Sequence, residues 1–439
     1  MKIPPVKGTR DFYPQDMAVR NWLIDGWKKV SMRNGFEEYD GPVFEYLKMF
    51  QLKSGDEIAE QLFSLTDRGG RELALRPEIT PTLARMVNQK INSLPRPIKW
   101  FSVPRLFRAE RPQKGRLREF FQWNVDIIDS DKVLADAETI FCALDYLREV
   151  GLTPDDIVVK ISSRKLLAAF LKYVGISKSA IDSLYPLLDK KAKLPPKTFK
   201  EELGKQVTNT AIADKIIAFM NAQSPDRVVD IIDRNDEIDD AVEELEELFR
   251  LLERMGVDDY CIFDPGIVRG LAYYTGIVYE IYDRVGELRA IGGGGRYDDL
   301  LKQFGGPTIA ATGFGLGDCV LEILLEEKGL LDKNVSKRQL DFFVIPVGTQ
   351  TYDYPDGTVK STPEDEAVKL TAGLRRRGYS AEFSYKSAGL SKQLKEASSR
   401  DAQKCIVIGD EFKNNELVVK DMSTGEQRLV NIDEFFSKL

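Results

Sequence analysis

The most informative stretch of the sequence is IKWFSVPRLFRAERPQKGRLREFFQWNVDIID, residues 98–129. Residues 98–110 and 118–129 are rich in aromatic and β-branched side chains that alternate with polar ones, a pattern typical of β-strands. The polar residues 111–117, which include Gly115, separate the two runs. The pattern predicts an antiparallel β-hairpin.

The second strand of this hairpin has two chemically different faces. Because side chains alternate along a strand, one face carries Phe121, Trp123, Val125 and Ile127, and the other carries Phe120, Gln122, Asn124 and Asp126. On the partner strand Arg108 and Glu110 share a face, so several hydrogen-bonding side chains are expected to converge above the sheet. From periodicity alone, the favoured alternative is an antiparallel sheet with one solvated face.

Basic residues around this hairpin favour an anionic ligand instead. Trp100 to Phe120 contains six basic and two acidic residues, and five of the six bases are arginines. Guanidinium groups form permanently charged, bidentate contacts with phosphate oxygens. The hairpin and its loop are therefore candidates for polyanion binding.

Two further segments combine cations, phenols and glycines. Arg269 is followed by Tyr273 and Tyr274, and residues 292–295 are four consecutive glycines before Arg296, Tyr297 and Asp298. Such a glycine run permits close approach of a ligand to the backbone, or forms a simple loop or bulge. Neither segment fits GxGxxG after a strand or the P-loop pattern, so the usual dinucleotide-binding and P-loop sites are excluded.

Composition limits the chemistry further. The chain has 439 residues with 43% hydrophobic and 30% charged residues, which indicates a folded protein of several domains. It contains no histidine, which excludes Ser-His and Cys-His catalytic arrangements and HExxH metal sites. The four cysteines lie far apart without a CxxC pair, so no zinc knuckle or disulfide framework is expected. We expect a cytoplasmic protein without a membrane partner, because no run of 18 apolar residues and no N-terminal targeting pattern occurs.

The net charge of −7 is concentrated in one segment. Residues 231–254 contain ten acids and three bases, so the rest of the chain is neutral overall and anionic partners are not excluded. An apolar stripe runs through this segment, and its members are Ile238, Val242, Leu245, Phe249 and Leu252. The spacing predicts an amphipathic helix whose acidic side faces solvent.

The remaining chain predicts an α+β protein of two domains. Helices are expected at residues 15–33, 43–53, 81–92, 131–150 and 317–328, and strands at 157–162 and 267–283. Residues 164–255 are expected to form a helical insertion within a first domain, 1–330. After a linker, residues 338–439 alternate short apolar strands with helices, which predicts a small α/β domain with a largely parallel sheet.

Several ordered motifs carry a specific resemblance. They are KGTRDF at 7–12, LRPEIT at 75–80, FRAERPQKGR at 107–116, RGLAYY at 269–274 and GGGGRYD at 292–298, with KQLK at 392–395 and VKD at 419–421. The chain resembles the histidyl-tRNA synthetases, which are class II aminoacyl-tRNA synthetases. The resemblance implies an antiparallel catalytic domain and a C-terminal anticodon-binding domain. It also implies ATP-dependent attachment of L-histidine to tRNA(His) through a histidyl-adenylate, with Mg²⁺, in a homodimer formed through residues 35–42.

The resemblance assigns roles to individual residues. Arg108 would bind the α-phosphate of ATP, Glu110 the adenine and Arg116 the distal phosphates, with Gly315 and Gly317 as further ATP-binding positions. Arg269 would stabilise the reacting α-phosphate, so Arg108 and Arg269 are the implied catalytic residues. The implied histidine-binding residues are Glu78, Thr80, Gln122, Asp126, Tyr273, Tyr274 and Tyr297. No protein-held metal site is implied.

Three positions depart from the family pattern. The third class II motif is GFGLGDCV at 313–320, so Val320 stands where most members have an arginine that binds ATP. Asp126 replaces a more usual glutamate, and Ala272 replaces a frequent aspartate. The alternative function is a non-charging, synthetase-like regulatory subunit that senses histidine in histidine biosynthesis. Such subunits usually lack the C-terminal domain.

Overall fold

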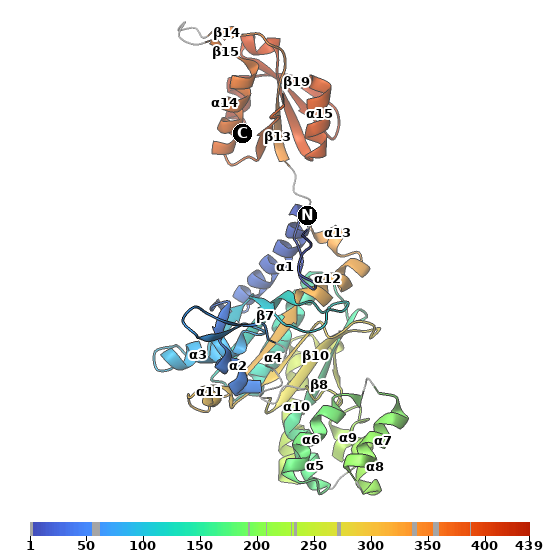
Figure 1. The fold of residues 1–439 in the computed structure, drawn as a ribbon. Helices are drawn as coiled ribbons and strands as arrows, with labels where there is room; N and C mark the ends of the chain where they lie inside the picture. The colour runs from blue at the N-terminus through green and yellow to red at the C-terminus, as the bar shows by residue number, and fades with distance from the viewer. Residues whose placement is uncertain are drawn as a thin grey trace. The chain divides into compact units, whose positions relative to one another are not determined.

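The computed structural model describes residues 3–54, 62–191, 194–207, 209–229, 231, 235–269, 274–335, 340–353, 360–386 and 388–439. The chain divides into two units, Met1–Val335 and Ser336–Leu439. Figure 1 shows the elements of each unit coloured along the chain.

A nine-stranded sheet forms the centre of the first unit. Its order is β1-β5-β7-β12-β11-β10-β8-β9, and β6 pairs with β7. The edge pairs β1–β5 and β8–β9 are parallel, and the pairs between them are antiparallel. The strands are β1 (Glu37–Glu38), β5 (Ile98–Ser102), β6 (Arg105–Phe107), β7 (Glu119–Ile128), β8 (Ile157–Ser163), β9 (Cys261–Phe263), β10 (Ile277–Asp283), β11 (Gly292–Arg296) and β12 (Ala311–Gly317). The predicted antiparallel sheet is confirmed.

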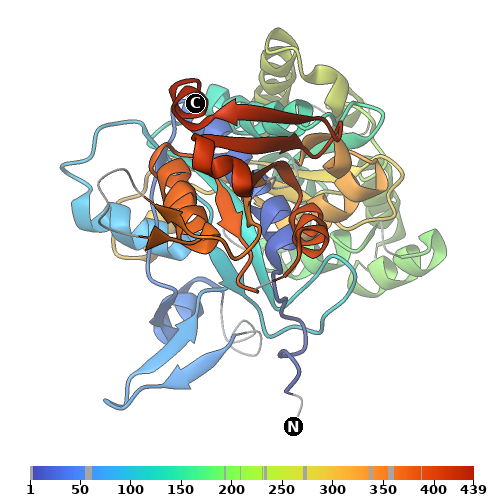
Figure 2. The ribbon, with the colours of Figure 1, turned by 90° about the horizontal axis from the view of Figure 1, so that it is seen from above.

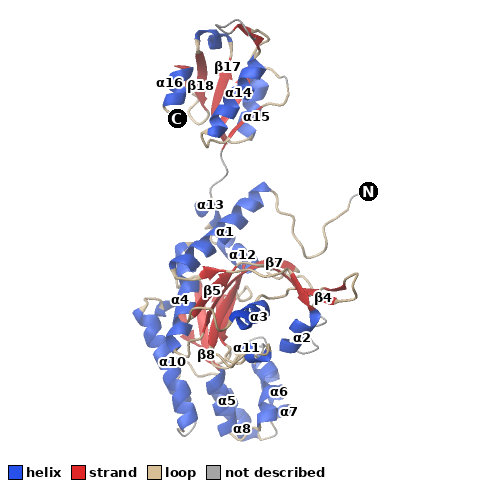
Figure 3. Cartoon of the chain, turned by 90° about the vertical axis from the view of Figure 1, so that its left-hand side faces the viewer, coloured by secondary structure: helices blue, strands red, loops and turns tan. Residues whose placement is uncertain are grey.

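One face of this sheet packs through aromatic side chains against helices α1 (Pro14–Arg33) and α4 (Val133–Glu149). The indole of Trp123 on β7 stacks on Trp27 of α1, with 6.2 Å between ring centroids, and its Nε1 donates to Ser31 Oγ at 2.8 Å. Tyr146 of α4 contacts both indoles edge-on. Figure 3 shows α1 and α4 on one side of the sheet and α3 (Thr80–Lys90) on the other. The polar face of β7 is therefore turned away from the main core.

A small three-stranded sheet lies beside α3. Its order is β2-β4-β3, with β2 (Phe44–Tyr46), β4 (Glu72–Leu75) and β3 (Ser64–Thr66). The helix predicted over residues 43–53 is wrong at its start, because pairing with β4 draws Phe44–Tyr46 into a strand before α2 (Leu47–Ser54) begins. Figure 2 shows the light-blue strands of this sheet projecting outward.

Helices fill the segment between β8 and β9, as predicted. They are α5 (Arg164–Tyr173), α6 (Lys178–Leu188), α7 (Pro196–Gln206), α8 (Thr210–Phe219), α9 (Asp226–Val229) and α10 (Asp236–Arg254). The predicted apolar stripe of α10 is confirmed, because Ile238, Val242, Leu245 and Leu252 are buried, while Phe249 is half-buried. The acidic side chains of α10 are mostly exposed, and Glu244 pairs with Lys165 at 2.6 Å. The solvated acidic face is therefore confirmed.

The predicted first strand of the hairpin is interrupted. β5 ends at Ser102 and β6 covers only Arg105–Phe107, because Pro104 lies between them and cannot donate a ladder hydrogen bond. Arg108 and Glu110 therefore lie beyond the strand rather than on its face. The glycine run, in contrast, is a strand: β11 pairs with β10 on one side and with β12 on the other.

The second unit has a mixed five-stranded sheet of order β16-β13-β17-β18-β19. The parallel strands are β13 (Leu340–Pro346), β16 (Ala381–Phe383) and β17 (Ala402–Ile408), joined through helices α14 (Pro363–Arg376) and α15 (Leu390–Ser399). β18 (Glu416–Asp421) and β19 (Gln427–Asn431) continue the sheet antiparallel. The largely parallel prediction was wrong for these strands, because their short connections permit only antiparallel pairing.

Candidate active site

Two adjoining cavities open on the polar side of the central sheet. The arginine-lined cavity has a volume of about 180 Å³, and its lining includes Arg108, Arg116, Arg269, Gly317 and Val320. The acidic cavity has a volume of about 80 Å³, and its lining includes Glu78, Thr80, Asn124, Asp126 and Tyr274. The two linings share Arg108, Gln122, Arg269, Gly293 and Gly315. An anionic ligand and a polar ligand can therefore meet at the same arginines.

Glycines on β12 make room for the polar side chains of β7. A Cβ atom at Gly313 would lie 2.3 Å from Asp126 Oδ1, and one at Gly315 would lie 2.8 Å from the amide of Gln122. Gln122 and Asp126 thus lie across the neighbouring strand. Tyr297 donates a hydrogen bond from its hydroxyl to Asp126 Oδ1, and both residues are almost fully buried. The position of the Asp126 carboxylate is therefore fixed by a glycine of the neighbouring strand and by a phenol.

Arg269 lies between the two cavities in a strained backbone conformation. Its φ is +53°, in the left-handed region that residues other than glycine rarely adopt. Its guanidinium pairs with Glu280 at 3.6 Å and donates to the Gly294 carbonyl at 3.3 Å. A Cβ atom at Gly293 would lie 2.7 Å from Arg269 Nη1, so this glycine admits the arginine. The predicted close approach at the glycine run is made by an arginine of the chain itself.

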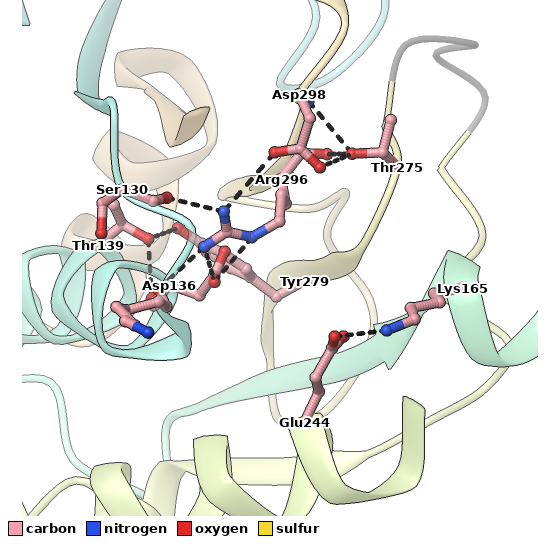
Figure 4. Close-up of polar contacts among 10 residues, drawn as sticks. Ser130, Asp136, Thr139, Lys165, Glu244, Thr275, Tyr279, Arg296 and Asp298 are labelled. Atoms are coloured by element: carbon pink, nitrogen blue, oxygen red, sulfur yellow. Dashed lines mark hydrogen bonds and ion pairs between the residues drawn. The ribbon is translucent and has the colours of Figure 1, made fainter. Parts of the chain in front are cut away.

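A buried polar network holds the strand that carries these glycines (Figure 4). Arg296, at the end of β11, pairs with Asp136 of α4, which is completely buried, and donates to the Ser130 carbonyl at 2.9 Å. Burial raises the pKa of Asp136, although the Arg296 guanidinium opposes that shift. Thr275 donates to Asp298 at 2.7 Å, which connects the strand to the segment after Tyr274. These contacts orient the floor of both cavities.

The loop after β6 supplies two more arginines. Arg108 donates from Nε to the Pro77 carbonyl at 3.1 Å, and its guanidinium lies 4.9 Å from the centroid of the Phe120 ring. Arg116 forms an ion pair with Glu110. The structure thus brings Arg108 and Arg116 to the arginine-lined cavity. Glu110, in contrast, contacts Arg116 and does not line either cavity.

The other predicted site residues are distributed as follows. Glu78, Thr80, Gln122, Asp126 and Tyr274 line the acidic cavity, and Gly315 and Gly317 line the arginine-lined cavity. Tyr297 lies one contact further from the cavity, behind Asp126. Tyr273 lies outside the described residues.

Comparison with known proteins identifies the family. A sequence profile described as Histidyl-tRNA synthetase matches residues 8–317, and one described as Anticodon binding domain matches residues 341–439. The chain belongs to the histidyl-tRNA synthetase family. Together these matches cover both units of this synthetase family member.

Relatives of this histidyl-tRNA synthetase family member match it along nearly its whole length. Histidine--tRNA ligase, chloroplastic/mitochondrial, from Arabidopsis thaliana is 39% identical over 433 residues, which cover 98% of this chain and 86% of that protein. Histidine--tRNA ligase from Pyrococcus abyssi is 36% identical over 100% of this chain and 98% of that protein. The crystal structure of histidyl-tRNA synthetase from Nostoc sp. PCC 7120 superposes with a TM-score of 0.80 at 26% identity, and the match covers 100% and 99% of the two chains.

Sequence reasoning missed two residues beside this synthetase site, Asp136, which pairs with Arg296, and Arg289, which neighbours Arg116. Asp136 belongs to an apolar helix pattern, and only its isolated acidic character among buried neighbours could have marked it. Arg289 lies three residues before the glycine run, and its hydrogen bond to Gln113 depends on how the chain folds.

Among the described helices, none has the length and apolar character needed to cross a membrane.

Proposed function

We propose that this chain attaches L-histidine to tRNA(His) with ATP, through a histidyl-adenylate intermediate. Family membership supports this reaction. One structural observation supports its location in the two cavities, because both are lined by Arg108 and Arg269. A reaction between an amino-acid carboxylate and the α-phosphate of ATP requires two anions to be held together. Guanidinium groups at that junction offset their repulsion and stabilise the charge that develops during transfer.

The chemistry needs no protein histidine. A carboxylate oxygen of the amino acid forms a bond to the α-phosphorus, and the bond from that phosphorus to the bridging oxygen breaks, so that pyrophosphate leaves with both electrons. No proton moves in this step, since the attacking carboxylate is already ionised. In the second step a terminal hydroxyl of tRNA attacks the acyl carbon and AMP leaves, with a phosphate oxygen as the proposed base.

The acidic cavity suits histidine. We assign Glu78, Thr80 and Gln122 to the α-amino group, because Glu78 supplies an anionic acceptor beside two neutral polar groups. We assign Asp126, with Tyr297 and Tyr274, to the imidazole. The Asp126 carboxylate accepts a hydrogen bond from an imidazole N–H, and Tyr297 holds that carboxylate in place. Tyr273 keeps its expected role in the imidazole pocket as part of this proposal.

ATP occupies the arginine-lined cavity in this proposal. Arg108 and Arg269 contact the α-phosphate, Arg116 contacts the distal phosphates, and the backbone at Gly315 and Gly317 lies beside the nucleotide. Glu110 is kept as the adenine-binding residue, which requires its carboxylate to leave Arg116 when ATP binds.

Mg²⁺ enters this proposal with the phosphates of ATP. Among the described residues, no three acidic, cysteine or histidine side chains cluster in a way that would hold a metal ion. Mg²⁺ commonly keeps several waters and binds through one or two carboxylates together with substrate phosphates. Water and the ATP phosphates would therefore supply most of the ligands of Mg²⁺.

The second unit is the proposed anticodon-binding domain, residues 338–439, and the first is the proposed catalytic domain, residues 1–330. The fold of the second unit and its match to the anticodon-binding family support a role of that unit in tRNA binding. Basic residues at the end of α14 and around α15 are candidate phosphate contacts, and they are Arg375, Arg376, Arg377, Lys386, Lys392, Lys395 and Lys404. Complementation of the helix dipole explains the arginine cluster almost as well.

A cytoplasmic homodimer is part of the same proposal. Phe44, Tyr46 and Leu65 on the small sheet are 53%, 57% and 47% exposed, which suits a surface that a second copy covers. All four cysteines are free, as expected of a protein in a reducing compartment.

Pyrophosphate exchange tests the function. The protein is assayed for ATP–pyrophosphate exchange with each amino acid in turn, and Arg269→Ala is compared with Arg284→Ala. Arg284 is a control of the same residue type, because it is exposed and donates to the Pro154 carbonyl. We expect exchange with histidine alone, reduced on the order of 100-fold or more by Arg269→Ala, as for loss of a group that stabilises a transition-state anion. Histidine binding without any exchange would favour the histidine-sensing regulatory subunit instead.

A further inference from the structure

Arg289 lies at the rim of the arginine-lined cavity. It directly precedes Ala290, Ile291, Gly292 and Gly293, which line the cavity, and its side chain is exposed. Its guanidinium donates to Gln113 Oε1, on the loop between β6 and β7. Arg289 therefore bridges two rims of the cavity that come from distant parts of the chain.

Positive charge at this rim is incompletely balanced. Burial lowers the pKa of Arg116, and the neighbouring Arg289 and Arg108 lower it further by like-charge repulsion. Arg116 is paired with Glu110, and Arg269 with Glu280. In the described part of the chain Arg289 forms no ion pair with a carboxylate, and its guanidinium donates to a neutral amide. A bound polyanion would relieve the repulsion and engage the guanidinium of Arg289.

Among the described residues, helix α12 (Asp318–Glu327) contributes no cation to the lining of the cavity. Val320 of α12 is 7% exposed and packs beneath the loop that carries Gln113. Gly115 in that loop has φ +72°, and a Cβ atom there would lie 2.9 Å from Val320 Cγ2. The close approach of loop and helix thus requires glycine at position 115, and position 320 presents an apolar side chain to the cavity.

We infer that Arg289 binds the β- or γ-phosphate of ATP and supplies there the cation that position 320 lacks. This inference rests on the proposed function for the identity of the nucleotide. Arg289 and Arg116 would bind the distal phosphates from two sides, while Arg108 and Arg269 bind the α-phosphate. In the adenylation step Arg289 would then stabilise the negative charge that accumulates on the departing pyrophosphate.

Titration calorimetry separates distal from proximal phosphate contacts. A non-hydrolysable ATP analogue and AMP are each titrated into the full-length protein, Arg289→Ala, Arg289→Lys and the control Arg284→Ala. We expect Arg289→Ala to weaken binding of the ATP analogue by about 10- to 100-fold, as for loss of a charge-assisted hydrogen bond, and to leave AMP binding unchanged. Arg289→Lys should be intermediate, and Arg284→Ala should match the unsubstituted protein.

Each other outcome has a defined meaning. Equal affinities of Arg289→Ala and Arg284→Ala for the ATP analogue would overturn the inference, and so would an equal loss of AMP affinity in Arg289→Ala. If the ATP analogue binds through Arg289 but histidine-dependent exchange is absent, the inference stands and the charging function fails. If the unsubstituted protein binds no ATP analogue, both fail. Matching thermal unfolding of the variants excludes misfolding as the cause.

Discussion

Substitution of Gly313 by alanine tests whether this glycine of β12 fixes the position of Asp126. The new Cβ atom would lie 2.3 Å from Asp126 Oδ1 and 2.5 Å from the Val125 carbonyl oxygen, whereas ordinary contacts of a Cβ begin at 3.4 Å. The carboxylate must therefore move by about 1 Å, since 3.4 − 2.3 = 1.1. A movement of that size breaks the alignment of Asp126 with the Tyr297 hydroxyl.

The size of the expected loss in activity follows from the hydrogen bond between Asp126 and Tyr297 that is broken. A hydrogen bond to a charged group contributes about 1.5–3 kcal/mol, which corresponds to about a 10- to 150-fold change in an equilibrium or specificity constant. Overpacking of the strand should also lower the free energy of unfolding by about 1–3 kcal/mol. Because Asp126 faces the acidic cavity, the loss should fall on histidine rather than on ATP.

The assay is histidine-dependent ATP–pyrophosphate exchange, with KM measured separately for histidine and for ATP. We expect kcat/KM for histidine to fall by about 10- to 150-fold in Gly313→Ala. Gly204→Ala is the matched control, because a Cβ atom at Gly204 in α7 meets nothing within 4 Å. That control should leave both KM values unchanged.

A double-substitution cycle links the effect to Asp126. If Gly313→Ala acts through the carboxylate, Asp126→Asn and the double variant should lose similar amounts of activity, so the effects will not add. An unchanged kcat/KM for histidine in a folded Gly313→Ala protein would refute the reasoning, and so would an equal rise in the KM for ATP.

Two further predictions concern the second unit. Hydrogen bonds from the Ser423 hydroxyl and from the Thr424 and Ser423 backbone lower the pKa of Asp421 to about 2, below its ordinary value of 3.8. The ionised carboxylate therefore stabilises the fold fully above pH 3.8, and this stabilisation is lost as the pH falls through about 2. Ser423→Ala should move the Asp421 pKa, followed by carboxyl NMR titration, upward toward 3.8, and an unmoved midpoint would contradict the assignment. Deletion of residues 338–439 should spare adenylate formation but weaken tRNA charging, and equal loss of both activities would refute the proposed division of labour.

The hairpin shows what the sequence alone allowed. Alternation along β7 placed Trp123 in the core and Gln122 and Asp126 on the opposite face, because period two is a local property of any strand. The break between β5 and β6 was marked by Pro104, yet the aromatic and β-branched run on both sides obscured it. Local pattern therefore predicted which side chains face the cavities but not where the strand ends.

The glycine run shows what local pattern could not give. Glycine has low strand propensity, so residues 292–295 are compatible with a loop until their partners on β10 and β12 are known. The same applies to Arg289 and Asp136, whose contacts join residues 176 and 160 positions apart in the chain. Such pairings depend on the tertiary fold, and no single-segment pattern contains them.

The glycines of β11 and β12 also affect which substitutions could give resistance to an inhibitor of this site. Where β11 lies beside Gly313 and Gly315 of β12, the floor presents main-chain atoms instead of bulky side chains. A compound that draws its affinity from this floor would contact groups that point substitutions cannot replace. Added side chains there would collide with the Asp126 carboxylate or the Arg269 guanidinium, which the proposed function assigns to the substrates. Drug resistance would therefore have to arise outside this glycine floor.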